Sequence, residues 1–307
     1  MEITSNAMRT LEDRFQKLFN NDWAIAQENA WWDQLATEKP SGGKTEIYQF
    51  LMTTFSLKAL PNGQMVYSNL VTQAFEATNE KRGGGIELDA ADIADDEFEF
   101  AADWAGQAGS AIALAPQDLI TDLILAGETA NGYDGVPFFS DAHPINPAVN
   151  GSDTYDNLVT GAALSTSTFA AGVGLMKSYK MPNGKNRNLR PSLLVVPPSL
   201  EKVGLEITQA RFISATDNLL ATSNGIGLLV IPELEDEPGS WYLASQAPKA
   251  GTGINPFIYQ LRQPYAMKSF TNMDDARLSE IDKFQWHIRG RDAAVYGHPF
   301  QMIKFKA

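Results

Sequence analysis

The stretch IELDAADIADDEFEFAADWAGQAGSAIALAPQDLITDLILAG, residues 86–127, is the most informative about the architecture because it joins the patterns of a strand, an acidic cluster and a long helical region. Acidic residues ahead of a helix suit both its capping and its dipole. From Phe98 to Ile112, apolar and small side chains recur at helical spacing, and small residues permit close packing. Pro116 suits a first helical turn and Gly127 a C-terminal stop, so we expect one long helix or two in line.

Residues 1–40, ahead of this stretch, are predicted to form an N-terminal arm that contains a helix. Apolar side chains from Leu11 to Phe19 recur at helical spacing and give the helix one apolar face. Either the helix docks on its own domain, or the arm buries its aromatic side chains on a neighbouring subunit, each contributing on the order of 2 kcal/mol. On the second interpretation, the expected intersubunit contacts are Phe15, Phe19, Trp23, Trp31 and Trp32.

Residues 41–88 are predicted to form an extended hairpin loop. The segments 45–55 and 69–79 have the composition of strands, and Pro61-Asn62-Gly63 between them is a turn signal. A hairpin alone is marginally stable in water, so a neighbouring subunit could supply the surface that it needs. Its expected intersubunit contacts are Tyr48, Phe50, Phe75, Lys81 and Arg82, and its expected hinges are Gly42, Gly43, Gly83, Gly84 and Gly85.

The rest of the chain divides into three segments. Residues 128–156 are rich in Gly, Pro, Asn and Asp, and we expect two phenylalanines, Phe138 and Phe139, to pin this loop to the core. Residues 157–256 alternate between helical and strand patterns, which predicts a compact α/β unit. The chain from 257 onward is mostly β, and residues 284–289 alternate apolar and polar with the period of a half-buried strand. Beside it, Arg289, Arg291 and Asp292 are expected to form a structural or intersubunit charge cluster.

Composition limits the class of protein. With 24 basic and 37 acidic residues, the net charge is −13, and such a chain makes a poor general DNA binder, although an acidic wall is compatible with a DNA container. The absence of cysteine excludes disulfides and cysteine-based zinc sites. No apolar run approaches the roughly 18 residues that span a bilayer, and no signal peptide is evident, so we expect a cytoplasmic protein without a membrane partner.

Some motifs could indicate an enzyme. His143 and Asp141 could form an acid–base or metal site, but a His-Pro turn capped by Asp141 explains the pattern better. The acidic residues 92–99 lack the spacing of a calcium loop, and the glycine-rich segments 83–85 and 251–253 fit no nucleotide-binding signature. We therefore expect no catalytic residue, no cofactor and no metal, and keep a metal-dependent hydrolase centred on His143 as the less favoured alternative.

Four passages together resemble the major head subunit (T protein) of Mu-like phages and prophages. The first is residues 86–127, and the second is YDGVPFFSDAHP, residues 133–144, which matches a family pattern of Tyr-Asp-Gly, paired aromatics and His-Pro. The third is LRPSLLVVPPSLEKVGLEI, residues 189–207, and the fourth is RGRDAAVYGHPFQMIKF, residues 289–305. The resemblance spans roughly residues 40–307, and the order and spacing of the passages carry it.

This resemblance implies an α+β fold of the Hong Kong 97 type. Its parts would map onto the chain in order, with 1–40 as the N-terminal arm and 41–88 as the extended hairpin loop. A peripheral domain with a long spine helix would comprise 89–156 and 257–307, and residues 157–256 would form an inserted axial α/β domain.

The resemblance also implies a structural, non-catalytic protein that self-assembles, as pentamers and hexamers, into the icosahedral head of a tailed phage. Its place would be the virion capsid, after assembly in the host cytoplasm. Expected partners are encapsidated double-stranded DNA, bound without sequence specificity, and separate scaffolding, portal and decoration proteins. The alternative within a phage particle is a minor head or decoration protein. Deletion of residues 1–35 is expected to leave a soluble protein that forms no stable shells.

Overall fold

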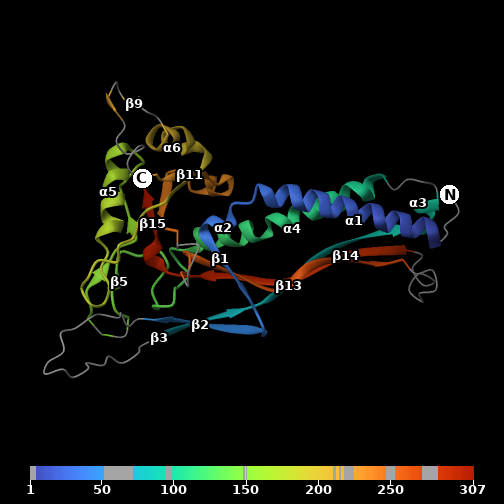
Figure 1. Ribbon diagram of the computed structural model, residues 1–307, viewed down its shortest axis with the longest axis horizontal. Coiled ribbons are helices and arrows are strands. Elements are labelled where there is room, and N and C mark those ends of the chain that lie inside the picture. Colours follow the sequence, from blue (N-terminus) through green and yellow to red (C-terminus); the bar gives the residue numbers. More distant parts are fainter. Residues whose placement is uncertain are drawn as a thin grey trace, which may run out of the picture.

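The computed structural model describes residues 5–51, 72–94, 99–147, 149, 151–209, 212–213, 216–217, 225–246, 253–271 and 283–307. The molecule is elongated, because two long helices and a long sheet extend to one side of a compact unit of shorter elements (Figure 1). The N-terminal end lies at the tip of this extension, and the C-terminal end lies in the compact unit.

The long sheet has four strands in the order β1 (Ala36–Pro40), β13 (Phe257–Phe270), β14 (Lys283–Tyr296) and β4 (Glu80–Asp89). β1 runs parallel to β13, and the other neighbours are antiparallel. The predicted alternation in β14 is confirmed: its apolar side chains are buried on one face, while the intervening polar ones lie on the other. The buried members of this alternation are Phe284, Trp286 and Ile288.

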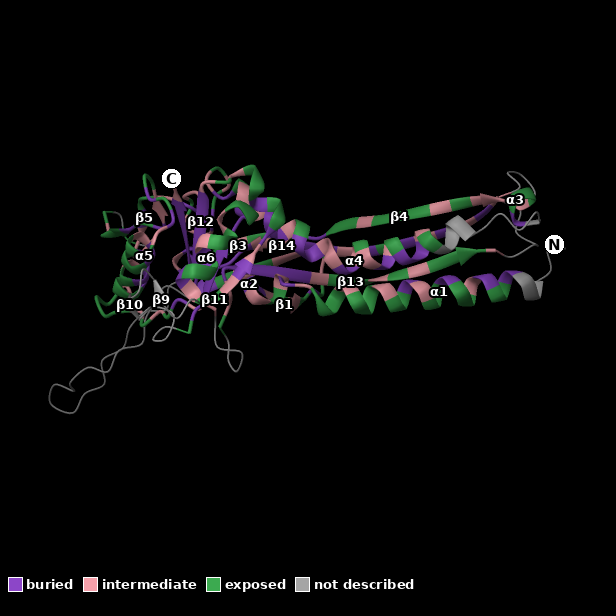
Figure 2. Ribbon diagram, turned by 90° about the horizontal axis from the view of Figure 1, so that it is seen from above, coloured by how far each residue is buried: buried purple, intermediate pink, exposed green. Residues whose placement is uncertain are grey.

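Two long helices cover the buried face of this sheet. α1 (Ser5–Glu28) runs alongside α4 (Glu99–Ala126), and the short α3 (Ala90–Ala94) lies near the start of α4 (Figures 1 and 2). Of the two alternatives for 89–127, a single helix after residue 99 is correct, since α4 continues through Pro116. The acidic residues 95–97 lie outside the described part of the chain.

Small residues let α1 approach α4 closely, as the sequence predicted for this face. A Cβ atom on Gly109 would lie 2.3 Å from the backbone oxygen of Phe19, which is far inside van der Waals contact. The stretch Asp103–Ala126 is apolar and long enough, by those criteria alone, to cross a membrane. Here it packs beside α1 on the buried face of the sheet.

The compact unit contains a five-stranded sheet flanked by helices. Its strand order is β11 (Gly227–Val230), β8 (Leu193–Val196), β12 (Ser240–Ala244), β15 (Met302–Lys306) and β7 (Leu158–Val159). The helices and strands predicted between 157 and 256 are present, but β15 was expected in the other domain. The remaining elements are α5 (Thr166–Ser178), α6 (Glu201–Thr208), β5 (His143–Pro144), β6 (Thr154–Tyr155), β9 (Phe212–Ile213), β10 (Thr216–Asp217) and the 3-10 turns Pro198–Leu200, Pro232–Asp236 and Pro299–Gln301.

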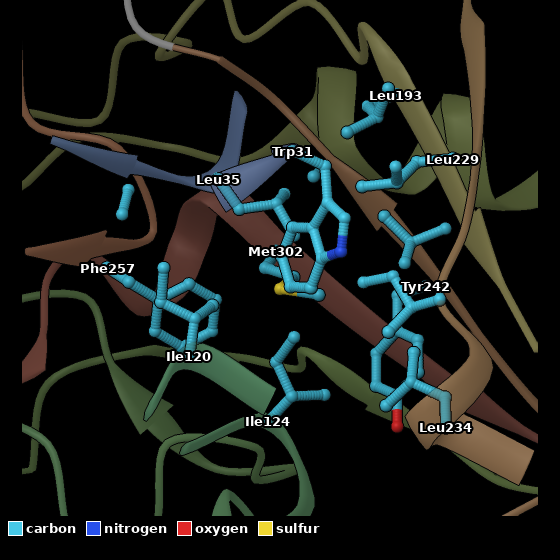
Figure 3. Close-up of a cluster of buried hydrophobic side chains, with 14 of the residues drawn as sticks. Trp31, Leu35, Ile120, Ile124, Leu193, Leu229, Leu234, Tyr242, Phe257 and Met302 are labelled. Carbon is cyan, nitrogen blue, oxygen red and sulfur yellow. The ribbon is translucent and has the colours of Figure 1, made fainter. Parts of the chain in front are cut away.

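One hydrophobic cluster joins the extension to the compact unit. It gathers Trp31, at the start of the short helix α2 (Trp32–Leu35), with Ile120 and Ile124 of α4 and side chains from the five-stranded sheet (Figure 3). A second cluster, which includes Met8, Leu11 and Phe284, lies nearer the tip, although β4 is largely exposed along the extension (Figure 2). The two parts are therefore joined by the first cluster, while each also has a core cluster of its own.

The predicted hairpin is present at its base, where β2 (Thr45–Leu51) pairs antiparallel with β3 (Thr72–Thr78). Pro61-Asn62-Gly63 lies outside the described residues. After Asn79 the chain enters β4, all of which pairs with β14. The hairpin therefore ends near Asn79, and not at residue 88 as expected.

The expectation that Gly83, Gly84 and Gly85 form a hinge is wrong for this structure. All three lie inside β4, opposite Arg289, Ile288 and His287 of β14. A Cβ atom on Gly83 would lie 2.3 Å from the Ile288 carbonyl oxygen, and one on Gly85 would lie 2.8 Å from the Trp286 carbonyl oxygen. These glycines permit close approach of two strands.

Gly83→Ala is therefore expected to lower the free energy of unfolding by about 1–3 kcal/mol, because the new methyl group forces β4 away from β14. The control is Gly84→Ala, since a Cβ atom at Gly84 meets nothing within 4 Å. That variant should stay within about 0.5 kcal/mol of the parent protein. Urea unfolding followed by circular dichroism measures both, and equal stability of the two variants would contradict the strand register.

Candidate assembly surfaces

The aromatic side chains of α1 lie mostly inside the chain's own core. Phe15 is completely buried, with its ring centroid 5.1 Å from that of Trp286, and Phe19 is buried beside α4. The interpretation that a second copy covers these two side chains is therefore wrong here, and docking on the chain's own domain is the correct alternative. Trp23 differs, because it remains 38% exposed, close to the exposed Ile25.

Trp31 and Trp32 also make their contacts within the chain itself. Trp31 is buried in the junction cluster, and its backbone N–H donates to Oε1 of Gln117 at 2.7 Å. Trp32 packs on Tyr259 with 5.2 Å between ring centroids. Deletion of residues 1–35 would uncover these partners and Trp286, so the structure favours a folding defect over a soluble, assembly-deficient protein.

An apolar groove lies beside Trp23. It has a volume of about 380 Å³ and runs between α1, α4 and β13. Trp23, Pro116, Tyr259 and Pro264 contribute to its walls, together with polar groups such as Asn20. Of the N-terminal aromatic side chains, Trp23 at this groove is thus the one that offers substantial surface to a partner.

The base of the hairpin is held by a hydrogen-bond network at the residues expected to form a hinge. Oε1 of Glu46 accepts from the backbone N–H groups of Gly42 at 2.6 Å and Gly43 at 2.8 Å, and from the Ser41 hydroxyl at 2.9 Å. The bond from Gly43, followed by those from Ser41 and Gly42, lowers the pKa of Glu46. Asn79 donates to the Ser41 hydroxyl and to the Gly43 carbonyl. This loop is fixed by its own side chains, which corrects the hinge assigned to Gly42 and Gly43.

One face of the hairpin packs on the chain's own body. Phe50 is buried against Tyr133 and His298, with ring centroids 4.4 and 5.0 Å away. Burial, then the charge of Arg187, lowers the pKa of His298 to about 4, so this ring is neutral at pH 7. Phe50 is therefore not an open contact for another subunit.

Tyr48 and Phe75 are partly covered in the same way. The Tyr48 hydroxyl donates to Oε1 of Gln260 at 2.7 Å, and burial, then the charge of Glu46, raises the pKa of Tyr48 to about 12. Phe75 packs against the neighbouring hydrophobic clusters. The other face of the hairpin is open, since Ile47 is 65% exposed. Ile47 was not among the residues predicted from the sequence, because aromatic and basic residues were chosen there as the expected contacts of the hairpin.

The basic residues of the long sheet divide between its two faces. Arg82 lies on the helix-covered side, where its Nε is 3.1 Å from Oδ1 of the fully buried Asp292. Oδ2 of Asp292 accepts from the hydroxyls of Tyr259 at 3.1 Å and Tyr265 at 3.0 Å. This cluster is structural and differs from the expected one, because Asp292 pairs with Arg82 and not with Arg289 or Arg291. The other three predicted residues, Lys81, Arg289 and Arg291, lie on the opposite face of the sheet.

The loop of residues 128–156 is pinned as predicted, since Phe138 and Phe139 are buried. His143 is fully buried, with Nδ1 2.6 Å from Oδ2 of Asp134 and Nε2 3.1 Å from the Phe138 carbonyl oxygen. The carboxylate that contacts the ring is that of Asp134, and not that of Asp141, with which the less favoured enzyme-like alternative had grouped His143. Both ring nitrogens face hydrogen-bond acceptors, so the geometry does not favour a catalytic or metal-binding role for His143. In the described part of the chain, no group of three potential ligands is placed to hold a metal ion.

Asn157 is a structural residue that sequence reasoning missed. Its side-chain amide donates to three backbone carbonyls, those of Phe138 at 2.7 Å, Pro299 at 3.0 Å and Met302 at 3.2 Å. Its Oδ1 accepts from the backbone N–H of Ser140 at 2.8 Å. The side chain is fully buried and ties the loop to the C-terminal strand. No local sequence signal marks such a residue, because its partners are far apart in the chain.

Comparison with solved structures identifies the fold. Over 99% of this chain and 76% of the other, the protein is similar to a chain of the bacteriophage JBD30 procapsid, with a TM-score of 0.60 and 20% identity. The cyanophage P-SCSP1u capsid gives a TM-score of 0.59 at 11% identity, over 90% of this chain and 88% of the other. A virus-like particle from Pyrococcus furiosus gives 0.53 at 9% identity, over 94% and 98%. The expected α+β capsid fold of the Hong Kong 97 type is confirmed.

Sequence comparison identifies the family. The major capsid protein of Escherichia phage Mu is 25% identical over 167 residues, which cover 54% of this chain and 51% of that protein. The chain thus spans about half the length of the curated relative that it matches. A family model described as the Mu-like prophage major head subunit gpT matches residues 8–165, 158–234 and 230–306. Since these segments cover nearly the whole chain, the protein belongs to the Mu-like major head subunit gpT family.

Proposed function

We propose that this chain is the major capsid protein of a tailed phage or prophage and self-assembles into an icosahedral head around double-stranded DNA. The family match along nearly the whole chain is the observation that carries the proposal. The capsid fold agrees with it. The protein would be structural and non-catalytic, and its place would be the virion, after assembly in the host cytoplasm.

Assembly would use the surfaces that the folded subunit leaves open. The hairpin projects beside the long sheet, with Ile47 exposed (Figure 1). Trp23 opens onto the apolar groove, and Lys81, Arg289 and Arg291 lie on the outer face of the sheet. Contacts between different surfaces of neighbouring copies close into rings, here pentamers and hexamers. Many such contacts, each modest, add up through multivalency.

The other proposed partners follow from the same role. The packaged DNA would be enclosed without sequence-specific recognition, because a chain of net charge −13 does not favour binding phosphates. Scaffolding and portal proteins would be separate chains, with decoration proteins added to the shell. No cofactor is proposed.

Negative-stain electron microscopy of the purified full-length protein tests the proposal directly. We expect capsomers or closed shells, with this chain as the most abundant protein of the isolated particle. A protein that stays monomeric at high concentration would refute a shell-building role. A low copy number in isolated particles would point to a minor head or decoration protein.

Ile47→Asp is expected to reduce shell formation at least about tenfold without unfolding the subunit, because the side chain is mostly exposed and its contacts would be lost many times per particle. The control is Lys185→Asp, at an exposed position in the loop after α5, which places a new carboxylate on the surface outside the hairpin strands. Circular dichroism should give both variants the parental melting temperature. Normal shell yield from Ile47→Asp would contradict a contact at this face of the hairpin.

A further inference from the structure

The outer face of the long sheet carries a group of basic side chains, here called the basic face. In the strand register, Arg291 of β14 lies opposite Lys81 of β4, and His287 lies opposite Lys268 of β13. Residues directly opposite in a sheet point to the same face, and alternate residues along a strand do so too. Arg289 therefore points the same way, and the five side chains adjoin one another.

These charges are not neutralised within the described part of the chain. None of Lys81, Lys268, Arg289 and Arg291 lies within ion-pair distance of a described carboxylate. Nε of Arg291 is buried from solvent and has no hydrogen-bond partner there. Burial, then the charges of Arg289 and Lys268, lowers the pKa of His287, which reflects the positive potential of the face.

Two neighbouring cations of the sheet are paired, unlike those of the basic face. Lys283, on the same face of β14, forms an ion pair with Glu87 at 3.0 Å. On the helix-covered side, Arg82 is paired with Asp292. Like charges directly opposite one another destabilise a sheet, so the arrangement costs stability in the isolated subunit.

The face is also hollowed. Gly83 and Gly85 leave no side chain opposite Arg289 and His287. A hollow of about 380 Å³ lies beside Gly83, and its lining includes Lys81 and Arg289. A second hollow of about 350 Å³ lies over β13 and β14, and its lining includes Lys81, Lys268 and Arg291. A side chain from a partner could enter this hollow and meet several cations at once.

We propose that the basic face is a docking surface for carboxylate side chains of a second copy of this chain, which rests on the proposed function as a shell-building protein. With 37 acidic and 24 basic residues, a second copy presents an excess of carboxylates. Opposite charges then fix which surfaces meet and in which register. Each copy would offer its basic face to one neighbour.

Duplex DNA fits the same face less well. Along β4, Glu87 and Asp89 follow the cations on the same face of the sheet. A duplex lying along the strands would bring phosphates onto these carboxylates, because DNA carries one negative charge per roughly 1.7 Å of its axis. A small group of carboxylate side chains on a second copy can contact the cations without lying over the acidic residues of β4.

The test is the double variant Lys268→Gln/Arg289→Gln in the full-length protein. Its control is Lys283→Gln/Lys185→Gln, which removes the same charge from a residue that is already paired and from an exposed loop. Shell yield is measured by sedimentation over a range of NaCl concentrations. Binding of a 30-base-pair duplex is measured by fluorescence anisotropy.

We expect the basic-face variant to lose shell yield at least about tenfold at low salt, and the parental yield to fall as NaCl screens the contact. The control should assemble like the parent, and the melting temperature of the basic-face variant should be equal or higher, because repulsion is relieved. Parental shell yield from that variant overturns the docking surface and leaves the capsid function standing. If the parent protein binds the duplex and the basic-face variant does not, the basic face binds DNA, and the proposal of a second copy as its partner is overturned. Absence of shells from the parent itself refutes the capsid function, and the docking proposal with it.

Discussion

Phe15→Ala is expected to lower the free energy of unfolding by about 3–5 kcal/mol, the usual cost of removing a fully buried phenylalanine. The ring of Phe15 is completely buried between α1, α4 and β14, and it contacts the equally buried Trp286. The cavity left by alanine would lie at the contact between the N-terminal helix and the sheet, where the surrounding core is thin. Urea unfolding monitored by tryptophan fluorescence measures the loss.

The control for Phe15→Ala is Trp23→Ala on the same helix. Trp23 is an aromatic side chain of larger size, but it is 38% exposed, so its removal should cost clearly less than that of Phe15. If Phe15→Ala were as stable as the parent protein, α1 would not be docked on its own subunit in solution. The alternative, in which the arm is completed by a neighbouring copy, would then be favoured.

Asn157→Asp is expected to be as damaging, although it changes a single group in the side chain. The amide nitrogen that donates to the carbonyls of Phe138, Pro299 and Met302 becomes an oxygen that can only accept when ionised. Three buried carbonyls would then face a buried negative charge, and each unsatisfied group costs about 1–3 kcal/mol. We expect little folded protein at pH 7.

Asn183→Asp is the matched control, because its exposed Oδ1 accepts from the Lys185 backbone N–H and a carboxylate can accept the same bond. That variant should melt within a few degrees of the parent protein. Differential scanning calorimetry over pH 5–8 compares the two. A folded Asn157→Asp protein with the parental melting temperature would show that the loop of residues 128–156 is held by other contacts.

The sequence predicted those elements whose signal is local. The period of two in β14 and the helical spacing of Leu11 to Phe19 reflect burial against one face, and both elements form as expected. The small residues of α4 predicted close packing, and Gly109 lies against α1. The short strands between 157 and 256 were recognisable because proline and glycine border them.

Pairing across long sequence distances could not be predicted in the same way. The glycines at 83–85 have the composition of a hinge, and only the pairing with β14 reveals that they let two strands approach closely. β15 continues from the peripheral segment but pairs with β12 and β7 of the other sheet. The sequence around Phe15 and Phe50 would look the same if these side chains packed against another copy. It therefore could not show that their partners lie in the same chain.

The position of β15 inside the five-stranded sheet has a consequence for synthesis of the protein. Met302 belongs to the junction cluster, while Ile303 and Phe305 belong to the core of the compact unit. A nascent or truncated chain that stops before Met302 therefore leaves both cores open and β12 with an unpaired edge. A subunit with open cores lacks its folded shape, so under the proposed function ribosome-bound and prematurely terminated products would not fit into growing particles.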